Sequence, residues 1–271
     1  MKKRDVFVSF IKGIITGFGT LVPGVSTAAV ILSVSVYEKV IESLHNLSKK
    51  DNKVLLFVSI PFFIGIIIGL IGGIQLVSYL WNNYKVQTLL LFAGLVLGGI
   101  RVVSKKEKIE FNNKTIIFFI FVSLLFGGLN YLLKDITILS KTSSISNVCL
   151  LSLITGVSLL IPGSSLITMK LNANYKYLFG LVKKLSSFSI VRIIVFVLIL
   201  MITVLILAKT IYKLIDKHKD QVYIVLCSLM FASVVISLLQ INNFTFNFVN
   251  IFTSLIALLW GYIFAKNVER E

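Results

Sequence analysis

The amino-acid sequence predicts an all-α polytopic membrane protein that is built as an inverted repeat. Hydrophobic residues make up 57% of the chain and the mean hydropathy is +0.96, which is far above the values of water-soluble domains. Residues 15–26 recur 139 positions later as residues 154–165, with seven identities. Two of the chain's three prolines, Pro23 and Pro162, take the same position in this repeat. We therefore expect two related halves, each with one helical hairpin broken at a Pro-Gly pair and three transmembrane helices.

Hydropathy places the elements within each half. A helix needs about 20 apolar residues to cross the hydrocarbon core of a bilayer. The first half, residues 1–140, is predicted to contain a re-entrant hairpin over 6–44 and spans over 54–80, 86–103 and 115–133. The second half, residues 141–271, is predicted to contain a hairpin over 147–182 and spans over 189–208, 221–240 and 248–265. Because a hairpin returns the chain to the side it came from, each half crosses an odd number of times and the halves must be inverted.

The distribution of basic residues predicts the orientation. The net charge is +16, and most lysines and arginines fall in the segments that the span pattern places on one side, at 2–4, 49–53, 101–114 and 209–219. Cytoplasmic loops carry this excess, so both termini are predicted to be cytoplasmic. The charges are scattered between apolar stretches, which favours contact with anionic lipid headgroups and excludes a continuous nucleic-acid-binding face.

The repeated motif predicts a binding site for an anion. Proline lacks an N–H and breaks an arriving helix, glycine permits a sharp turn, and the amides after the break need a polar partner within a bilayer. Ser26 and Ser165 can cap the new helices, and Thr27 and Ser164 add hydroxyls. Two helix starts that meet near the bilayer midplane are the usual construction of a transporter's substrate site. The alternative is a simple kink in which the serine bonds back to its own helix. The predicted binding residues of the two motifs are Pro23, Gly24, Val25, Ser26, Thr27, Pro162, Gly163, Ser164 and Ser165.

Few ionisable residues fall within the apolar segments, and each is a functional candidate. Lys170 follows Ser165 by five residues and could either neutralise a bound phosphate or extend to the interface. Arg192 could neutralise the same charge or anchor its span at the interface. Glu38 is predicted to lie at the mouth of the first hairpin and to pair with Lys39, and proton coupling is the less favoured alternative for it.

Small residues at four-residue spacing predict close helix packing. Gly94, Gly98 and Gly99 in the first half can be matched with small residues of the second half, Ser228, Ala232 and Ser233. For Gly65, Gly69 and Gly73 we expect packing rather than a functional role.

The cysteines and histidines do not have the spacing of a metal site. Cys149 and Cys227 lie alone in apolar stretches and are expected to be packing residues. His45 and His218 lie in polar connections far from the repeated motif. We expect no catalytic residue, no metal and no cofactor.

The motifs resemble those of a known family, the bacterial polyprenyl-phosphate transporters, formerly a domain of unknown function. The resemblance extends over nearly the whole chain. The family's first half is similar to P-G-V-S-G-G-T followed by a Tyr-Glu pair, and its second half to P-G-x-S-G-S. The matching residues are Pro23, Gly24, Val25, Ser26, Tyr37, Glu38, Pro162, Gly163 and Ser165.

The resemblance implies a function and a location. It implies a flippase that returns undecaprenyl phosphate from the outer to the inner leaflet of the bacterial cytoplasmic membrane, for cell-envelope synthesis. It also makes Tyr37 and Glu38 candidates for coupling or gating. A lipid monophosphate would need an anion site for its head and a groove open to lipid for its tail. The bilayer and this anionic lipid are the expected partners, and a homo-oligomer is compatible with the sequence.

The sequence departs from the family pattern at several positions. Thr27 and Ala28 replace the glycine pair, Leu166 and Ile167 replace the second Gly-Ser, and the second tyrosine is displaced to Tyr175 or Tyr177. The turns are therefore expected to be less glycine-rich, while the proline break and the capping serine are retained.

Three alternatives remain at this stage. An undecaprenyl-pyrophosphate phosphatase has a similar repeat, but it uses an arginine after the motif serine together with acidic and histidine residues, and Thr27 and Leu166 stand here instead. A secondary transporter of a small anion could use the same helix starts. A scaffold protein without transport activity is disfavoured, because the backbone groups left unpaired at the broken helices would then destabilise it in the bilayer without forming a binding site.

Overall fold

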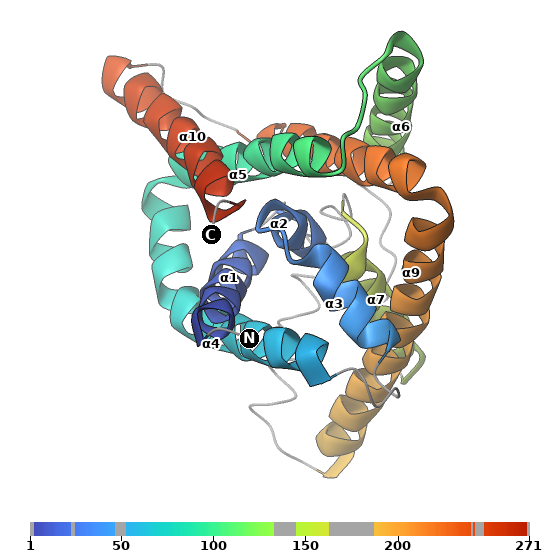
Figure 1. Ribbon diagram of the computed structural model, residues 1–271. Helices are drawn as coiled ribbons and strands as arrows, with labels where there is room; N and C mark the ends of the chain where they lie inside the picture. The colour runs from blue at the N-terminus through green and yellow to red at the C-terminus, as the bar shows by residue number, and fades with distance from the viewer. Residues whose placement is uncertain are drawn as a thin grey trace.

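The protein was analysed as a computed structural model, which describes residues 3–22, 25–46, 53–132, 145–162, 187–239, 241 and 247–269. Every regular element within these ranges is an α-helix. The helices α1, α2, α3 and α7 lie inside an enclosure formed by α4, α5 and α9, and α6 and α10 stand at its outer corners (Figure 1). The helices that flank the repeated motifs are thus surrounded by the longer helices of the chain.

The first predicted hairpin consists of three helices. Helix α1 (Lys3–Leu21) ends immediately before the first motif, and α2 (Thr27–Ser33) and α3 (Tyr37–His45) follow it. We expected a single helix after the motif, and the structure corrects this. The backbone of Ser35 takes φ 57°, the left-handed region that a right-handed helix cannot include, so α2 ends and α3 begins a new helix. All seven residues of α2 are buried.

Helix α4 (Lys53–Asn83) packs parallel to α1 through glycines. A Cβ added to Gly13 would meet the carbonyl of Phe62, and one added to Gly17 would lie 2.5 Å from the carbonyl oxygen of Ile66. Gly69 also lies against Ile14, and further along both helices Gly73 lies against Phe18. The residue numbers of the contacts rise together along both helices, so the helices run in the same direction. The chain between them must therefore return to the end of the bundle where α1 begins. The expected packing role of the α4 glycines is confirmed.

Helices α5 (Lys85–Lys106) and α10 (Phe248–Glu269) also pack parallel to each other. Gly94 lies against Leu258, and a Cβ on Gly98 would come 2.7 Å from the carbonyl oxygen of Tyr262. Small residues therefore allow the two backbones to approach closely. Helix α5 follows α4 directly, with Tyr84 alone between them, and it ends on Lys105 and Lys106, which suit the negative end of the helix dipole.

The second half contains α7 (Ile145–Leu160) and α9 (Ser187–Leu238), while α6 (Asn113–Leu132) completes the first half. Helix α9 covers two of the predicted spans and is kinked at His218, whose φ of −140° and ψ of 52° are not helical. Helices α6 and α7 both pack against α9. Gly156 of α7 contacts Thr203 of α9, and Ser123 of α6 donates a hydrogen bond to the carbonyl of Ser228.

The helices present apolar side chains outward. Four helices in the described ranges are long and apolar enough to cross a membrane: Ser59–Asn83, Lys85–Lys106, Ile190–Leu238 and Phe248–Val268. Their outer faces and that of α6 carry large exposed side chains, among them Ile71, Leu124, Ile206, Phe248 and Trp260. A surface of this kind belongs in lipid, so the chain is a multi-pass membrane protein. The main apolar core surrounds α2 and α3.

Candidate functional site

The chain turns sharply at the first motif. Helix α1 ends at Leu21, the amide of Val25 donates to the carbonyl of Val22 at 3.1 Å, and α2 begins at Thr27. Pro23 and Gly24 lie outside the described residues. The turn places Val25, Ser26 and Thr27 in the interior, where each is less than one-tenth exposed.

Ser26 carries a buried hydroxyl without a partner. It occupies the N-cap position of α2 with an extended backbone, φ −80° and ψ 128°, yet its side chain makes no capping hydrogen bond. Its Oγ is buried and has no hydrogen-bond partner within the described structure, a property shared with Ser35, Ser59 and Ser254. The prediction that Ser26 caps the helix is therefore wrong for its side chain, because the hydroxyl does not reach the first-turn amides.

Other buried hydroxyls of these helices are satisfied locally. Thr16 donates to the carbonyl of Lys12 at 2.8 Å, Ser33 to Ala29 at 2.7 Å, and Ser152 to Val148 at 2.7 Å. Such bonds to the preceding turn remove the cost of burying a hydroxyl in an apolar interior. The hydroxyl of Ser26 keeps that cost, and Ser26 is the one described serine that follows a Pro-Gly pair of the repeat. It is therefore available to a ligand.

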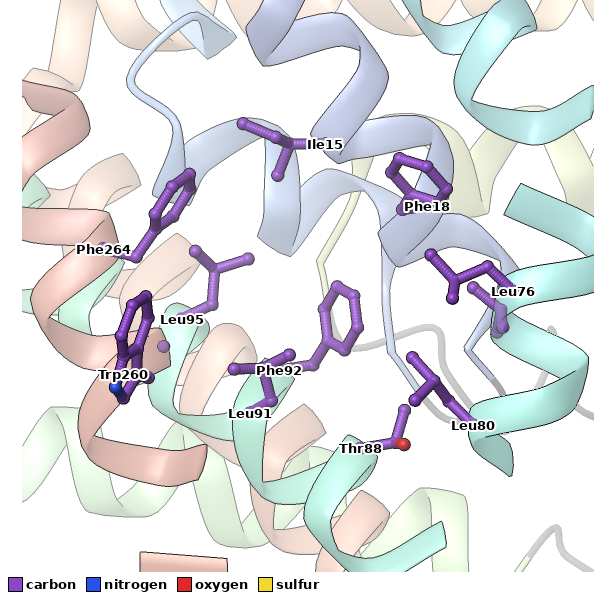
Figure 2. Close-up of a pocket in the computed structure, with 12 residues that line it drawn as sticks. Ile15, Phe18, Leu76, Leu80, Thr88, Leu91, Phe92, Leu95, Trp260 and Phe264 are labelled. Carbon is purple, nitrogen blue, oxygen red and sulfur yellow. The ribbon is translucent and has the colours of Figure 1, made fainter. Parts of the chain in front are cut away.

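An apolar pocket of about 270 Å³ lies beside the first motif, between α1, α4, α5 and α10. Figure 2 shows side chains from all four helices around it, including Phe18, Phe92 and Trp260. Two of the lining side chains are also exposed on the outer surface, Leu76 at 50% and Trp260 at 69%. Since both belong to membrane-spanning helices, the pocket opens toward lipid rather than only toward water.

The pocket and the motif share one apolar cluster. Val22 and Val25 flank the motif's Pro-Gly pair and belong to the same buried cluster as Val77 and Leu95, which line the pocket. Val30 of α2 joins this cluster, and a Cβ on Gly19 would lie 2.8 Å from it. Ser26 therefore follows, in sequence, a valine whose buried cluster continues into the lipid-facing pocket.

Tyr37 links the first hairpin to the second motif. Its Oη donates a hydrogen bond of 2.7 Å to the carbonyl oxygen of Leu160, the last residue of α7. Leu160 precedes Pro162 by two residues, and both are buried. The structure thus brings α3 against the end of the helix that leads into the second motif.

A cluster of four charged side chains, here called the ion-pair cluster, joins α3 to the end of α5 and to the kinked middle of α9. Its members are Glu38, Lys106, Glu107 and Lys219. The Nζ of Lys219 lies 2.8 Å from Oε2 of Glu107 and 3.7 Å from Oε1 of Glu38. The Nζ of Lys106 lies 3.6 Å from Glu38 Oε2 and 3.8 Å from Glu107 Oε1. The predicted pairing of Glu38 with Lys39 is wrong, because the helix places Glu38 toward α5 and α9 while Lys39 is exposed to the outside.

The remaining predicted site residues are only partly placed. Arg192 is half-buried in the second turn of α9. Those that lie outside the described residues are Gly163, Ser164, Ser165 and Lys170. Of the predicted residues, the structure therefore brings together Val25, Ser26 and Thr27 at the first motif and connects Tyr37 to the approach of the second.

Reasoning from sequence missed three members of the ion-pair cluster and the apolar pocket. Lys106 and Lys219 were counted only as loop charges and Glu107 was not considered, because their partners are distant along the chain. Trp260 and Phe92 gave no sign of a shared pocket, since both belong to ordinary apolar spans. Covariation between Glu38 and Lys219 would have been the signal for the cluster.

Comparison with known proteins supports the family resemblance. Residues 1–116 match the family model described as VCA0040-like, undecaprenyl phosphate translocase-like. No curated protein and no solved structure matched the chain. The matched region contains the first motif, Tyr37, Glu38 and all of α5. Over residues 1–116, the chain is therefore similar to the undecaprenyl phosphate translocase-like family.

Proposed function

We propose that the protein is a flippase that returns undecaprenyl phosphate from the outer to the inner leaflet of the bacterial cytoplasmic membrane. The observation that carries this proposal is the buried and unpartnered hydroxyl of Ser26, whose neighbour Val25 shares a buried cluster with the apolar pocket that opens toward lipid. An amphiphile with a polar head and a long apolar chain needs both features side by side. A small inorganic anion would need only the first of them.

The pocket is suited to part of a polyprenyl chain. Its volume of about 270 Å³ is just below the range for pockets that enclose drug-sized molecules. It would hold a segment of the chain next to the head, and the rest would remain in the bilayer. The exposed Trp260 and Leu76 would then lie where the chain passes from protein into lipid.

The phosphate would be held at the repeated motifs. In this proposal the hydroxyl of Ser26 donates to a phosphate oxygen, together with backbone amides near Gly24 and Val25. The second motif contributes Gly163, Ser164 and Ser165, and Lys170 or Arg192 neutralises the charge. Hydrogen bonds to a charged group are worth about 1.5–3 kcal/mol each, which would offset the cost of bringing a phosphate into the membrane.

An inverted repeat would let the site face each leaflet in turn. Two packing relationships support such a repeat. Gly17 packs on α4 and its counterpart Gly156 packs on α9, while Gly94 packs on α10 and its counterpart Ser228 packs on α6. Corresponding residues of the two halves thus contact corresponding helices. We propose alternating access between the halves, with re-entrant hairpins and both termini in the cytoplasm.

Reconstitution in liposomes tests the proposal. Undecaprenyl phosphate would be placed in the outer leaflet only, and a probe that binds exposed phosphate would follow its loss from that leaflet. We expect the protein to accelerate this movement, and the double variant Ser26→Ala/Ser165→Ala to slow it at least about tenfold. Ser33→Ala is the matched control, because its hydroxyl bonds within α2. The assignment of the site is wrong if the double variant, folded as judged by gel filtration, moves the lipid at the normal rate.

The same variants can be examined in intact cells. Depletion of the protein should leave more undecaprenyl phosphate exposed on the outer surface, and the intact chain should reverse this. No lipid movement by the purified protein in liposomes would sink the flippase proposal and favour a small-anion carrier.

A further inference from the structure

The ion-pair cluster lies at a different depth from the first motif. Val30 packs with Leu95 of α5, and Ser33 contacts Gly99 one turn further along the same helix. Glu38 then meets Lys106 at the end of α5. Leu95 and Lys106 are eleven positions apart, which is about 16 Å of helix. The cluster is therefore displaced from the pocket and the motif toward one end of α5, the end that the charge pattern predicts to be cytoplasmic.

The cluster connects parts of the chain that belong to different halves. Glu38 lies on α3, Lys106 and Glu107 at the end of α5, and Lys219 immediately after the kink of α9 at His218. The neighbouring Tyr37 adds a bond from α3 to α7. The first turn of α3 thus makes two interactions with the second half, a hydrogen bond to Leu160 and an ion pair with Lys219.

The cluster is partly open to water and partly buried. The side chains of Lys106, Lys219 and Glu38 are 46%, 48% and 39% exposed, whereas that of Glu107 is 5% exposed. A pocket of about 270 Å³ lies beside it, lined by Glu38 and Lys219 together with Tyr212 and Asp216. Exposed ion pairs are individually weak and exchange readily, while the buried carboxylate of Glu107 requires a cation beside it. These properties suit a contact that forms and breaks during a cycle.

We propose that the ion-pair cluster and the Tyr37–Leu160 bond close the cytoplasmic end of the passage, and that their release opens the site toward the inner leaflet. In the structure the ion pairs and the Tyr37–Leu160 bond are both formed, so in this proposal the structure represents the state that is closed on the inner side. The inference rests on the proposed function for its role in transport. The closure itself can be tested without any substrate.

Cys227 is a built-in reporter of this closure. It lies eight positions after Lys219 on α9, about 12 Å of helix further in, and it is fully buried. It belongs to the same apolar cluster as Tyr37 and Ile41 of α3, and its sulfur lies 4.0 Å from the hydroxyl of Ser104. Separation of α3 from α9 would expose this thiol to water that enters through the pocket beside Glu38.

The experiment measures modification of Cys227 by a membrane-impermeant maleimide in a Cys149→Ser background. It compares inverted membrane vesicles, which present the cytoplasmic side, with intact spheroplasts. We expect slow modification with the cluster intact and about fivefold faster modification in Lys219→Gln or Glu38→Gln, from the cytoplasmic side only. Lys219→Arg keeps the charge and should be modified as slowly as the unmodified protein. If the effect of Lys219→Gln came only from lost side-chain packing, Lys219→Arg would also be modified faster. Lys217→Gln and Glu110→Gln are matched controls, because both residues are exposed outside the cluster.

The outcomes separate the closure from the proposed function. Unchanged modification of Cys227 in both cluster variants, or faster modification from the outer side, would overturn the closure, whatever the liposome assay gives. Faster cytoplasmic modification with an unchanged melting temperature would support it. The proposed function is judged separately, by whether the unmodified protein moves undecaprenyl phosphate in liposomes.

Discussion

The hydroxyl of Tyr37 in α3 donates a hydrogen bond of 2.7 Å to the carbonyl of Leu160, the last residue of α7. The last carbonyls of a helix have no partner within it, and Pro162, two residues on, has no N–H and cannot continue the hydrogen-bond pattern. A residue of the first half therefore satisfies a backbone group at the broken helix of the second. This bond links the first hairpin to the approach of the second motif.

Tyr37→Phe should destabilise the protein by leaving the buried carbonyl of Leu160 without its donor. The expected cost is about 1–3 kcal/mol, seen as a lower melting temperature in detergent. Tyr79→Phe is the matched control, since Tyr79 is 58% exposed on α4. Equal melting temperatures for the two variants would mean that the bond does not contribute to stability.

Gly17→Ala should weaken the packing of α1 on α4. The added methyl group would lie 2.5 Å from the carbonyl oxygen of Ile66 and 2.8 Å from the amide nitrogen of Leu70, so the helices must separate at a cost of about 1–3 kcal/mol. At Gly128 of α6 an added Cβ would meet no atom within 4 Å among the described residues. Gly128→Ala should therefore retain or slightly raise the melting temperature. A reversed order of the two variants would contradict the packing described for α1 and α4.

Ser26→Ala should not lower the stability of the protein without lipid. Its hydroxyl has no partner to lose, and removal of a buried unsatisfied group is neutral or favourable. Ser33→Ala, which loses a bond to the carbonyl of Ala29, should lower stability by about 1 kcal/mol. Melting curves with and without undecaprenyl phosphate measure both effects. The lipid should stabilise Ser33→Ala as much as the unmodified protein and Ser26→Ala less, and equal stabilisation of all three would argue against Ser26 as a ligand.

Trp260 should report the entry of a lipid chain into the apolar pocket. The chain has two tryptophans, so Trp81→Phe leaves Trp260 as the single fluorophore. Because Trp260 lines the pocket and is 69% exposed on a membrane-spanning helix, acyl chains that carry bromine should quench its fluorescence. Added undecaprenyl phosphate should reduce this quenching. Strong quenching by aqueous iodide instead would show that the pocket opens to water.

The membrane class and the positions of the helices followed from local properties of the chain. A run of apolar residues must form a helix in a bilayer, because every backbone polar group needs a partner there, and the helices α4, α5, α6 and α10 cover the stretches where such runs were found. The end of α1 at the first motif follows from the same kind of rule, since Pro23 cannot continue a helix. The repeat itself was visible as identical letters at a fixed offset.

The split of the first hairpin into α2 and α3 was not visible in the sequence, because a serine with a left-handed backbone at position 35 has no sequence signature as strong as that of glycine. The partner of Glu38 was likewise misjudged. Its nearest basic residue in sequence is Lys39, but adjacent positions on a helix do not face each other. Only the packing of α3 against α5 and α9 selects Lys106 and Lys219.

Sequence therefore determined which segments enter the membrane and where the first helix must end, since these depend on the chemistry of neighbouring residues. The tertiary structure alone decided what surrounds the motif: the unsatisfied hydroxyl of Ser26, the apolar pocket beside it, and the ion-pair cluster about 16 Å along α5 from Leu95. Each of these depends on side chains from several helices meeting in space. The physical reason is that pockets and ion pairs are properties of packed surfaces, while helix formation and helix breaks are properties of the local chain.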